Sequence, residues 1–237
     1  MKDNGNKNSV SALIPGDALN GLVQVDTKPK TLSIMILDQS SSMMHYDDTP
    51  QTCINGVIEE CKNPKDGRTQ FCTVIAFDDE AEILLPLTLA TEVVPISNYR
   101  AKNMTLLWET VYQTLKVFRH FYRQANGLAD IKVYVAVFSD GDDNKSDRER
   151  QPRKVKKLAR SVRALGWELF CYGIGIDGER LAEDMGFPTD SDHAITVEGS
   201  PEAIANVTRH YSDATTTGCF DPNFFKKKQK TTTPQKP

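Results

Sequence analysis

Two short segments carry oxygen-bearing side chains at a spacing that can bind a metal ion. In the first, Asp38, Ser40 and Ser42 alternate along the chain, and in the second, Asp140 stands between a serine and a glycine. Residues i, i+2 and i+4 of an extended segment point to the same side, so the first three oxygens can converge. Thr105 adds a hydroxyl from a third segment. The pattern predicts a site built from two carboxylates and three hydroxyls.

The absence of nitrogen and sulfur ligands from this set indicates which metals it would select. Carboxylates, hydroxyls and water suit Mg²⁺, Mn²⁺ and Ca²⁺, whereas zinc and copper sites use histidine and cysteine. We expect Mg²⁺, with Mn²⁺ or Ca²⁺ as the alternatives. Mg²⁺ takes six oxygens and keeps several waters. Five side chains, some acting through water, would therefore leave one position open to a ligand.

The surrounding segments predict elements that bring these side chains together. Thr31–Leu37 and Ile131–Phe138 are continuous apolar runs of strand length, typical of strands that are buried on both faces. Asp38 and Asp140 follow the ends of these runs, and we expect Thr105–Gln124 to form a long helix that begins with the threonine. In a parallel α/β sheet, ligands bind at the carboxyl edge, where the connections diverge to opposite faces. The three segments should meet at that edge.

The rest of the pattern predicts a doubly wound α/β fold with a mostly parallel sheet and helices on both faces. Strand-like runs alternate with amphipathic segments, which implies parallel pairing through right-handed crossovers. Gln70–Phe77 and Ala81–Leu85 are too close for a crossover, so they must form a hairpin with one antiparallel edge strand. The other expected elements are helices at 51–62, 150–165, Glu179–Met185 and Pro201–Ser212, the last capped by Ser200, and strands at Trp167–Ile174 and His193–Val197.

These motifs together resemble the von Willebrand factor type A domain and its metal-ion-dependent adhesion site. That site uses an Asp-x-Ser-x-Ser loop, a threonine and an aspartate, which correspond here to Asp38, Ser40, Ser42, Thr105 and Asp140. In layout, with VIAFDDEAEILLPLT after the first helix, the chain is most similar to the stand-alone bacterial TerY-like proteins linked to tellurite resistance and stress.

The resemblance covers residues 29–212, with two departures from the family pattern. The family often has glycines before the threonine, whereas Ala101–Met104 precede Thr105 here. Ser41 stands where relatives often have glycine. The first departure implies a stiffer loop backbone before Thr105.

The resemblance implies a protein-binding function. In the family, the serines and the threonine approach the metal directly while the aspartates commonly act through water, so the ion keeps enough charge to take a carboxylate from a partner. We therefore expect a metal-dependent adhesion or scaffold module that recruits an Asp or Glu of another protein, in a bacterial stress-response system of the tellurite-resistance kind. The alternatives are a regulatory subunit coupled to an AAA+ ATPase, as in chelatases, and a Mg²⁺-dependent phosphoryl-transfer enzyme.

No motif supports the catalytic alternative. An aspartyl phosphatase would show Asp-x-Asp where Ser40 stands, and the chain has no Walker lysine, no Gly-x-Ser-x-Gly and no Cys/His pair. Gly173–Gly178 fits GxGxxG, but it lies late in the chain without a supporting βαβ unit, so we interpret it as a turn. We expect His45 to be exposed, and no partner is evident for His120, His193 or His210.

Composition and charge predict one soluble domain with two extensions. We expect an N-terminal extension at 1–28, the folded domain at 29–217 and a basic, disordered tail at 218–237. The chain carries a net charge of −3, and its last twelve residues hold five lysines and no acid, so the remainder carries −8. No run is long enough to cross a membrane or to form a secretory signal. Five scattered cysteines indicate free thiols, and we place the protein in the cytoplasm.

The predicted helix at 150–165 presents a strongly basic outer face. Val155, Leu158, Ala159 and Val162 form its inner stripe. We interpret the outer face as solvated and do not expect nucleic acid as a partner. The cations of this face are Arg153, Lys154, Lys156, Lys157, Arg160 and Arg163.

Overall fold

A computed structural model describes residues 28–125, 130–141, 143–146 and 151–218. Its strands are β1 (Lys30–Asp38), β2 (Thr69–Phe77), β3 (Ala81–Leu89), β4 (Ile131–Ser139), β5 (Glu168–Ile174) and β6 (Ala194–Val197). Its helices are α2 (Thr49–Cys61), α3 (Leu107–Ala125), α4 (Gln151–Arg163), α5 (Gly178–Met185) and α6 (Pro201–Thr217), with 3₁₀ turns η2 (Ser41–Tyr46) and η3 (Ala90–Glu92).

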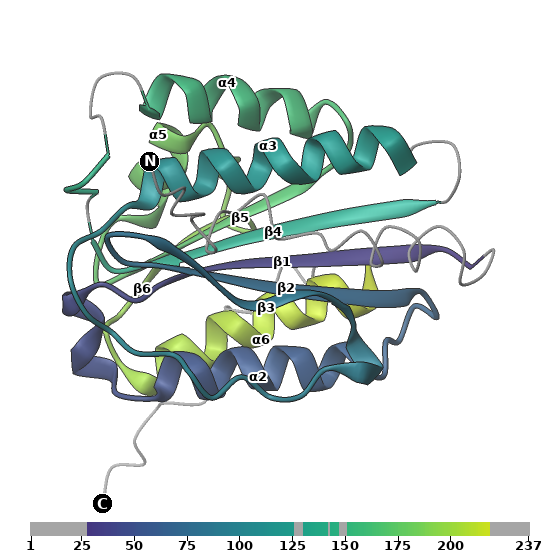
Figure 1. Ribbon diagram of the computed structural model, residues 1–237, viewed down its shortest axis with the longest axis horizontal. Helices are drawn as coiled ribbons and strands as arrows, with labels where there is room; N and C mark the ends of the chain where they lie inside the picture. The colour runs from purple at the N-terminus through teal and green to yellow at the C-terminus, as the bar shows by residue number, and fades with distance from the viewer. Residues whose placement is uncertain (1–27, 126–129, 142, 147–150, 219–237) are drawn as a thin grey trace, which may run out of the picture.

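The six strands form one sheet in the order β3-β2-β1-β4-β5-β6. Neighbouring strands are parallel everywhere except between β2 and β3, which form the antiparallel hairpin at one edge. Helices α3, α4 and α5 cover one face of the sheet, and α2 and α6 cover the other (Figure 1). The doubly wound, mostly parallel α/β class with one antiparallel edge strand is therefore confirmed.

The central strand β1 joins two hydrophobic cores. All nine of its residues are buried. Leu32, Ile34 and Ile36 belong to the core beneath α3, α4 and α5, whereas Met35 and Leu37 belong to the core above α2 and α6. The side chains alternate between the two faces because successive residues of a strand point to opposite sides. Because both faces of the strand are buried, its sequence is a continuous apolar run.

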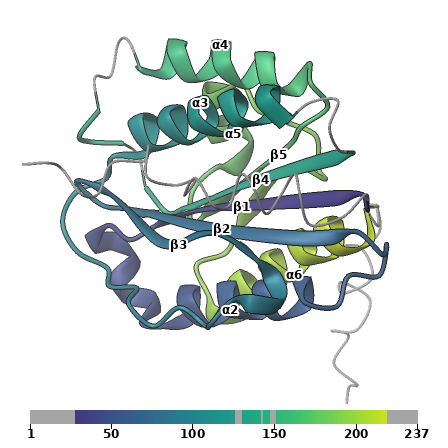
Figure 2. The same cartoon turned by 45° about the vertical axis from the view of Figure 1, so that its right-hand side comes forward.

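The connections diverge at the boundary between β1 and β4. Strand β1 leads into α2 on one face, and β4 leads into α4 on the other (Figure 2). Ligands of open α/β sheets bind at such a switch point, outside the carboxyl ends of the strands. The topology therefore places the ends of β1 and β4, with Asp38 and Asp140, at the expected position.

Two elements are longer than the sequence predicts. Strand β3 continues past Pro86 to Leu89, because Pro86 is exposed on an edge strand, where a missing N–H costs no ladder bond. Helix α6 continues past Ser212 to Thr217. Thr215 and Thr216 are buried, and the Thr216 hydroxyl donates to Ser212 O at 2.8 Å. Tertiary burial thus overrides the weak helix propensity of the threonine run.

The start of α3 also differs from the prediction. The helix begins at Leu107, so Thr105 lies before it. The Thr105 N–H donates to Asn144 Oδ1 at 2.9 Å, and the Leu106 N–H donates to Asp78 O at 2.7 Å. The Thr105 carbonyl, which a longer helix would pair with the Glu109 N–H, accepts the N–H groups of Asn144 and Lys145 instead. The Glu109 N–H donates to Ser146 Oγ at 3.2 Å.

Most of the predicted extensions lie outside the described residues. The predicted 1–28 extension and the 218–237 tail overlap the described chain only at Lys28 and Gly218, so both stay predictions. Four cysteines within the described chain are free thiols, as expected. In the ranges that the structure describes, no helix has the length and apolarity needed to cross a membrane.

We predict opposite stability effects for alanine at two helical glycines. An added Cβ at Gly178 would lie 2.3 Å from Ile195 O, whereas one at Gly56, exposed in the middle of α2, would meet no atom within 4 Å. Gly178→Ala should lower the free energy of unfolding by about 1–3 kcal/mol because it overpacks a backbone contact. Gly56→Ala should raise that free energy by about 1 kcal/mol through helix propensity. Urea unfolding checks both, and equal effects in the two variants would contradict the packing around Gly178.

Candidate metal-binding site

The site forms where β1 and β4 end side by side. The two strands pair in parallel with Leu37 opposite Phe138, so Asp38 and the Ser139–Asp140 pair emerge together at the carboxyl edge. Asp38 is fully buried, and its Oδ1 accepts the Ser40 N–H at 2.8 Å. This bond turns the chain immediately after β1 and directs the following serines back toward the strand end.

The Ser42 hydroxyl links the two predicted segments. Its Oγ lies 3.0 Å from Ser40 Oγ and donates to Asp140 Oδ1 at 2.7 Å. A methyl group added at Gly141 would lie 3.8 Å from Ser42 Oγ and 3.9 Å from Thr105 Oγ1. Both hydroxyls therefore face the same small space over Gly141. The structure brings all five sequence-predicted residues together.

Thr105 reaches this space because the loop that follows β4 holds its backbone. Its carbonyl accepts the N–H groups of Asn144 and Lys145, and its own N–H donates to Asn144 Oδ1. Asp143, one residue earlier, accepts the Trp108 N–H at 2.7 Å near the first turn of α3. The acidic side chain at this helix start stabilises the positive end of the helix dipole.

Ser139 contributes to the site although the sequence patterns did not predict a role for it. Its Oγ donates to Asp38 Oδ2 at 2.5 Å, so both carboxylate oxygens of Asp38 are held by hydrogen bonds. Tyr99 adds a further restraint, because its hydroxyl donates to Asp38 O at 2.9 Å. Only the position of Ser139, directly before Asp140 at a strand end, could have suggested this role. Tyr99 lies in an irregular segment that gives no such signal.

Burial sets the electrostatics of the two carboxylates. Desolvation raises the pKa of Asp38 to about 6, although its hydrogen bonds from Ser139 and Ser40 favour the charged form. Burial also raises the pKa of Asp140 above its usual range, and the Ser42 hydrogen bond opposes that shift. The two carboxylates repel each other across the site. A divalent cation between them would relieve this repulsion.

The donor set fits a hard divalent cation. It offers carboxylate and hydroxyl oxygens only, the ligand types that Mg²⁺ and Ca²⁺ prefer. Within the described parts of the chain, no group of three or more His, Cys, Asp and Glu side chains is placed to hold a metal. Metal binding at this edge would therefore depend on the hydroxyls of Ser40, Ser42 and Thr105.

The glycine motif at Gly173–Gly178 is a tight turn, as the sequence analysis proposed. An added Cβ at Gly173 would lie 2.7 Å from Ile176 O and 2.8 Å from Gly178 N. Gly175 has a φ of +70°, which favours glycine. Backbone crowding and turn geometry explain these glycines.

The histidines differ from expectation in their contacts. His45 is exposed, as predicted. The other three do have partners: His193 lies 2.7 Å from Asp190 Oδ1 and 3.0 Å from Glu168 Oε2, His210 Nδ1 lies 3.1 Å from Tyr172 OH, and His120 Nε2 lies 3.1 Å from Gln124 Nε2. Glu168 and Tyr172 are contacts from distant segments, whereas Gln124 and Asp190 lie within four residues of their histidines.

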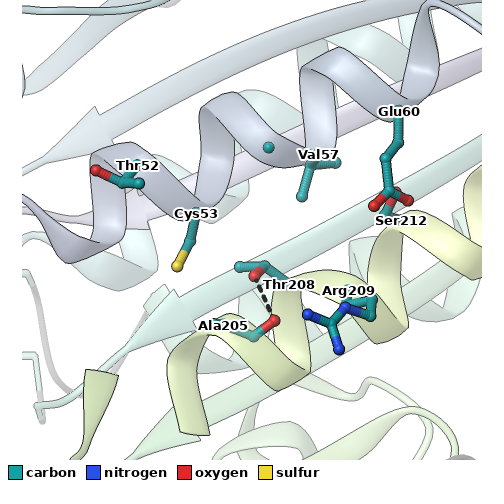
Figure 3. Close-up of a pocket in the computed structure, with 9 residues that line it drawn as sticks. Thr52, Cys53, Val57, Glu60, Ala205, Thr208, Arg209 and Ser212 are labelled. Atoms are coloured by element: carbon teal, nitrogen blue, oxygen red, sulfur yellow. Dashed lines mark hydrogen bonds between the residues drawn. The ribbon is translucent and has the colours of Figure 1, made fainter. Parts of the chain in front are cut away.

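A separate cavity of about 240 Å³ lies between α2 and α6, in the layer on the other side of the sheet (Figure 3). Cys53, half-buried, points into it, and burial raises the pKa of this thiol. The Thr208 hydroxyl donates to Ile204 O and Ala205 O, and Glu60 accepts the Ser212 hydroxyl. A protonated thiol beside internally bonded hydroxyls offers no activated nucleophile. The cavity shares no residue with the candidate metal site.

Comparison with known proteins shows the fold. No protein-family model matches the sequence, and no curated protein does. Among solved structures, a von Willebrand factor type A protein from Catenulispora acidiphila matches over 79% of this chain and 43% of its own, with 16% identity and a TM-score of 0.55. The pilus adhesin SpaC of Lactobacillus rhamnosus GG matches over 79% of this chain and 30% of its own, with 12% identity and a TM-score of 0.58.

A third match has a metal in the corresponding kind of site. Proximal thread matrix protein 1 of the mussel byssus, with a zinc-occupied metal-ion-dependent adhesion site, matches over 79% of this chain and 46% of its own, with 14% identity and a TM-score of 0.51. The chain thus spans less than half the length of these three proteins. It has the fold of von Willebrand factor type A domains, and the neighbours include adhesins.

We predict that the metal-free protein loses stability as the pH rises from about 4 to above 6. The folded state holds the Asp38 proton with a pKa near 6, against 3.8 when unfolded, so the folded state binds more protons throughout this range. The free energy of unfolding should fall by about 3 kcal/mol across it. Asp38→Asn should remove this component, as checked by urea unfolding in EDTA at several pH values.

Excess Mg²⁺ should reverse the dependence, because the cation competes with the Asp38 proton and binds more tightly toward neutral pH. Parallel stability curves for the wild type and Asp38→Asn in EDTA would contradict the raised pKa.

Proposed function

We propose that this protein is a metal-dependent protein-binding module of the adhesion-site type. A divalent cation, Mg²⁺, would be held directly by the hydroxyls of Ser40, Ser42 and Thr105, and through water by Asp38 and Asp140. The observation that carries the proposal is the position of the Ser42 hydroxyl. It lies at hydrogen-bond distance from Ser40, which follows β1, and from Asp140, which follows β4. A partner protein would supply an Asp or Glu carboxylate to the open position.

The burial of the five residues supports this division of roles. Asp38 is enclosed, and both its oxygens already accept hydrogen bonds, which suits a carboxylate that orients the site. Ser42 is exposed, so the site opens to solvent on the side of this serine. Neutral hydroxyl ligands leave most of the charge of the cation unneutralised. A carboxylate that approaches from solvent would then be attracted strongly.

The surroundings of the site suggest how a partner is selected. Asp78, Asp79, Glu80 and Glu82 line a cavity of about 370 Å³ beside the loop that carries Asn103. Lys102 also lines it and lies 3.7 Å from the buried Asp78, so Asp79, Glu80 and Glu82 supply its net acidic charge. The backbone of Asn103 accepts the Ser41 N–H, so this loop is joined to the site. An acidic rim repels carboxylates that do not reach the cation. The partner should therefore present a single carboxylate and not an acidic cluster.

Catalysis is not part of the proposal. Asp38 stands with Ser40, not with a second carboxylate, and its deep burial keeps it from attacking a substrate. The fold neighbours named above include an adhesin. A subunit coupled to an AAA+ ATPase would use the same site, and co-purification with an ATPase would favour that role. We propose a bacterial stress-response role in the cytoplasm on the TerY-like layout of the sequence.

We predict that Mg²⁺ raises the melting temperature through this site. A ligand that binds only the folded state stabilises it by about 2.7 kcal/mol at a hundred times its dissociation constant. For a domain of this size, that free energy corresponds to about 5–10 °C. The shift between EDTA and excess Mg²⁺ should vanish in Asp38→Ala and Ser42→Ala. It should persist in Ser41→Ala, which removes an exposed neighbouring hydroxyl outside the site.

The same variants test partner binding. Proteins captured on the immobilised chain in Mg²⁺ and released by EDTA should be lost with Ser42→Ala and kept with Ser41→Ala. Equal capture by both variants would refute the metal-dependent site even if Mg²⁺ stabilises the fold.

Ser139 is not a proposed metal ligand, but we predict that its substitution weakens metal binding. Ser139→Ala should weaken Mg²⁺ binding by about 10–100-fold, because it frees a carboxylate oxygen of Asp38 that must be oriented. It should also raise the pKa of Asp38 further, since that hydrogen bond favours the charged form. Calorimetric titration with Mg²⁺ at two pH values measures both effects. Ser139→Thr, which keeps the hydroxyl, should retain most of the affinity, and equal losses in the two variants would contradict the orienting role.

A further inference from the structure

Two neighbouring helices on one face of the molecule form a continuous basic surface. Helices α3 and α4 lie side by side over the sheet (Figures 1 and 2), and Arg119 of α3 donates to Ser161 Oγ of α4 at 2.9 Å. Along α3, Lys116, His120 and Arg123 recur at helical spacing and are exposed. We call the following set the basic surface: Lys116, Arg119 and Arg123 of α3, and Arg153, Lys154, Lys156, Lys157, Arg160 and Arg163 of α4.

The cations of the basic surface lack ion-pair partners among the described residues. Elsewhere in the described ranges, Lys62 pairs with Glu59, Lys65 with Asp213 and Arg68 with Asp130. On the basic surface, the resolved contacts are with neutral groups. Arg119 bonds a serine, Lys154 lies 5.8 Å from the centre of the Tyr112 ring, and Arg163 donates to Gly186 O. The positive charge of this surface is therefore uncompensated by described acids.

Helix stability does not explain this arrangement. Cations in the last turn of α4 favour the helix dipole, but Arg153 and Lys154 lie at its first turn, where positive charge is unfavourable. Like charges also recur three and four residues apart, as at Arg153, Lys157 and Arg160, which destabilises a helix. The packing of α4 on the rest of the fold requires only the apolar residues of its inner stripe. Because this placement of cations destabilises the helix, we infer that the cationic face has a ligand.

The character of the surface favours phosphate over an apolar interface or a membrane. The large hydrophobic side chains that are exposed within the described residues are Met44, Val94 and Met104, and none lies on α3 or α4. Protein interfaces depend on buried aromatic and apolar anchors, and amphipathic membrane helices on exposed Trp, Phe or Leu. Nucleic acid backbones need neither, because Lys and Arg neutralise phosphates without reading bases.

We propose that the basic surface binds the phosphate backbone of nucleic acid without sequence preference. The sequence showed only the row on α4, which reads as a solvated face; the structure adds the row on α3 and the lack of ion pairs among described residues. The surface shares no residue with the candidate metal site. The two places therefore do not overlap, so a partner protein could occupy the metal site while nucleic acid occupies the helices.

The test compares two variants of the full chain with equal loss of charge. One replaces four exposed cations of the basic surface (Lys116→Gln, Arg123→Gln, Lys157→Gln, Arg160→Gln), and the control replaces four exposed cations elsewhere (Lys65→Gln, Arg100→Gln, Arg180→Gln, Arg209→Gln). Both keep the lysine-rich tail. Fluorescence anisotropy with a mixed-sequence DNA duplex in EDTA, over a range of salt concentrations, measures affinity.

We expect the surface variant to bind at least tenfold more weakly than the control at low salt. Because each phosphate contact adds about 0.9 to the slope of log K against log salt, its slope should fall by up to about 4. Its melting temperature should not drop, since the substitutions remove repulsion. Ser42→Ala, which disrupts only the metal site, should bind DNA like the wild type.

Three results would overturn the proposal. Equal affinity of the surface variant and the control would assign any binding to general charge or to the tail. No binding by the wild type at low salt would exclude a nucleic acid ligand. Competition by poly-glutamate, or binding to anionic phospholipid vesicles, that is stronger than binding to the duplex would assign the surface to an acidic protein or to a membrane.

Discussion

The parallel pairing of β1 with β4 is the constraint on which the candidate site depends. Because Leu37 lies opposite Phe138, the two strands end level, and their next residues share one small volume. A slip of one residue would exchange the faces of every side chain in β1. Both faces of this strand are buried in separate cores, so such a slip would place core residues in the wrong layer. The burial that stabilises the fold therefore also fixes the geometry of the site.

That geometry keeps the Asp38 carboxylate away from water. Its hydrogen bonds offset only part of the free-energy cost of this desolvation. Ser139 and the Ser40 N–H hold both oxygens of Asp38, yet burial still raises its pKa to about 6. The hydroxyls of Ser40 and Ser42 bond to each other and to Asp140 in the same space. If a cation binds there, as we propose, it would offset the repulsion between the two carboxylates and so stabilise the folded state.

The molecule separates its charges by layer and by edge. Acidic residues gather around the carboxyl edge of the sheet, where Asp78 to Glu82 and Asp140 lie. The outer surfaces of α3 and α4 carry cations for which the described part of the chain provides no ion-pair partner. A net charge of −3 conceals this separation. Acid at the metal edge and base on the helices suit two ligands of different chemistry, a lone carboxylate held by a cation and a phosphate backbone.

Residue patterns were enough to predict the fold class, most element positions and the five residues that lie together at the sheet edge. They could do so because burial on both faces gives a strand a continuous apolar run, and because the Asp-x-Ser-x-Ser motif directly follows such a run. The oxygens converge through the Ser40 N–H bond to Asp38 and the 3₁₀ turn η2, not through the extended segment that the alternation predicts. Contacts between distant segments fixed the roles of Ser139 and Tyr99, the pairing of His193 with Glu168, and the extension of α6 through the buried Thr215 and Thr216. They also decided that the cations of α3 align with those of α4. Each of these depends on contacts between segments far apart in the chain, which periodicity and propensity do not encode.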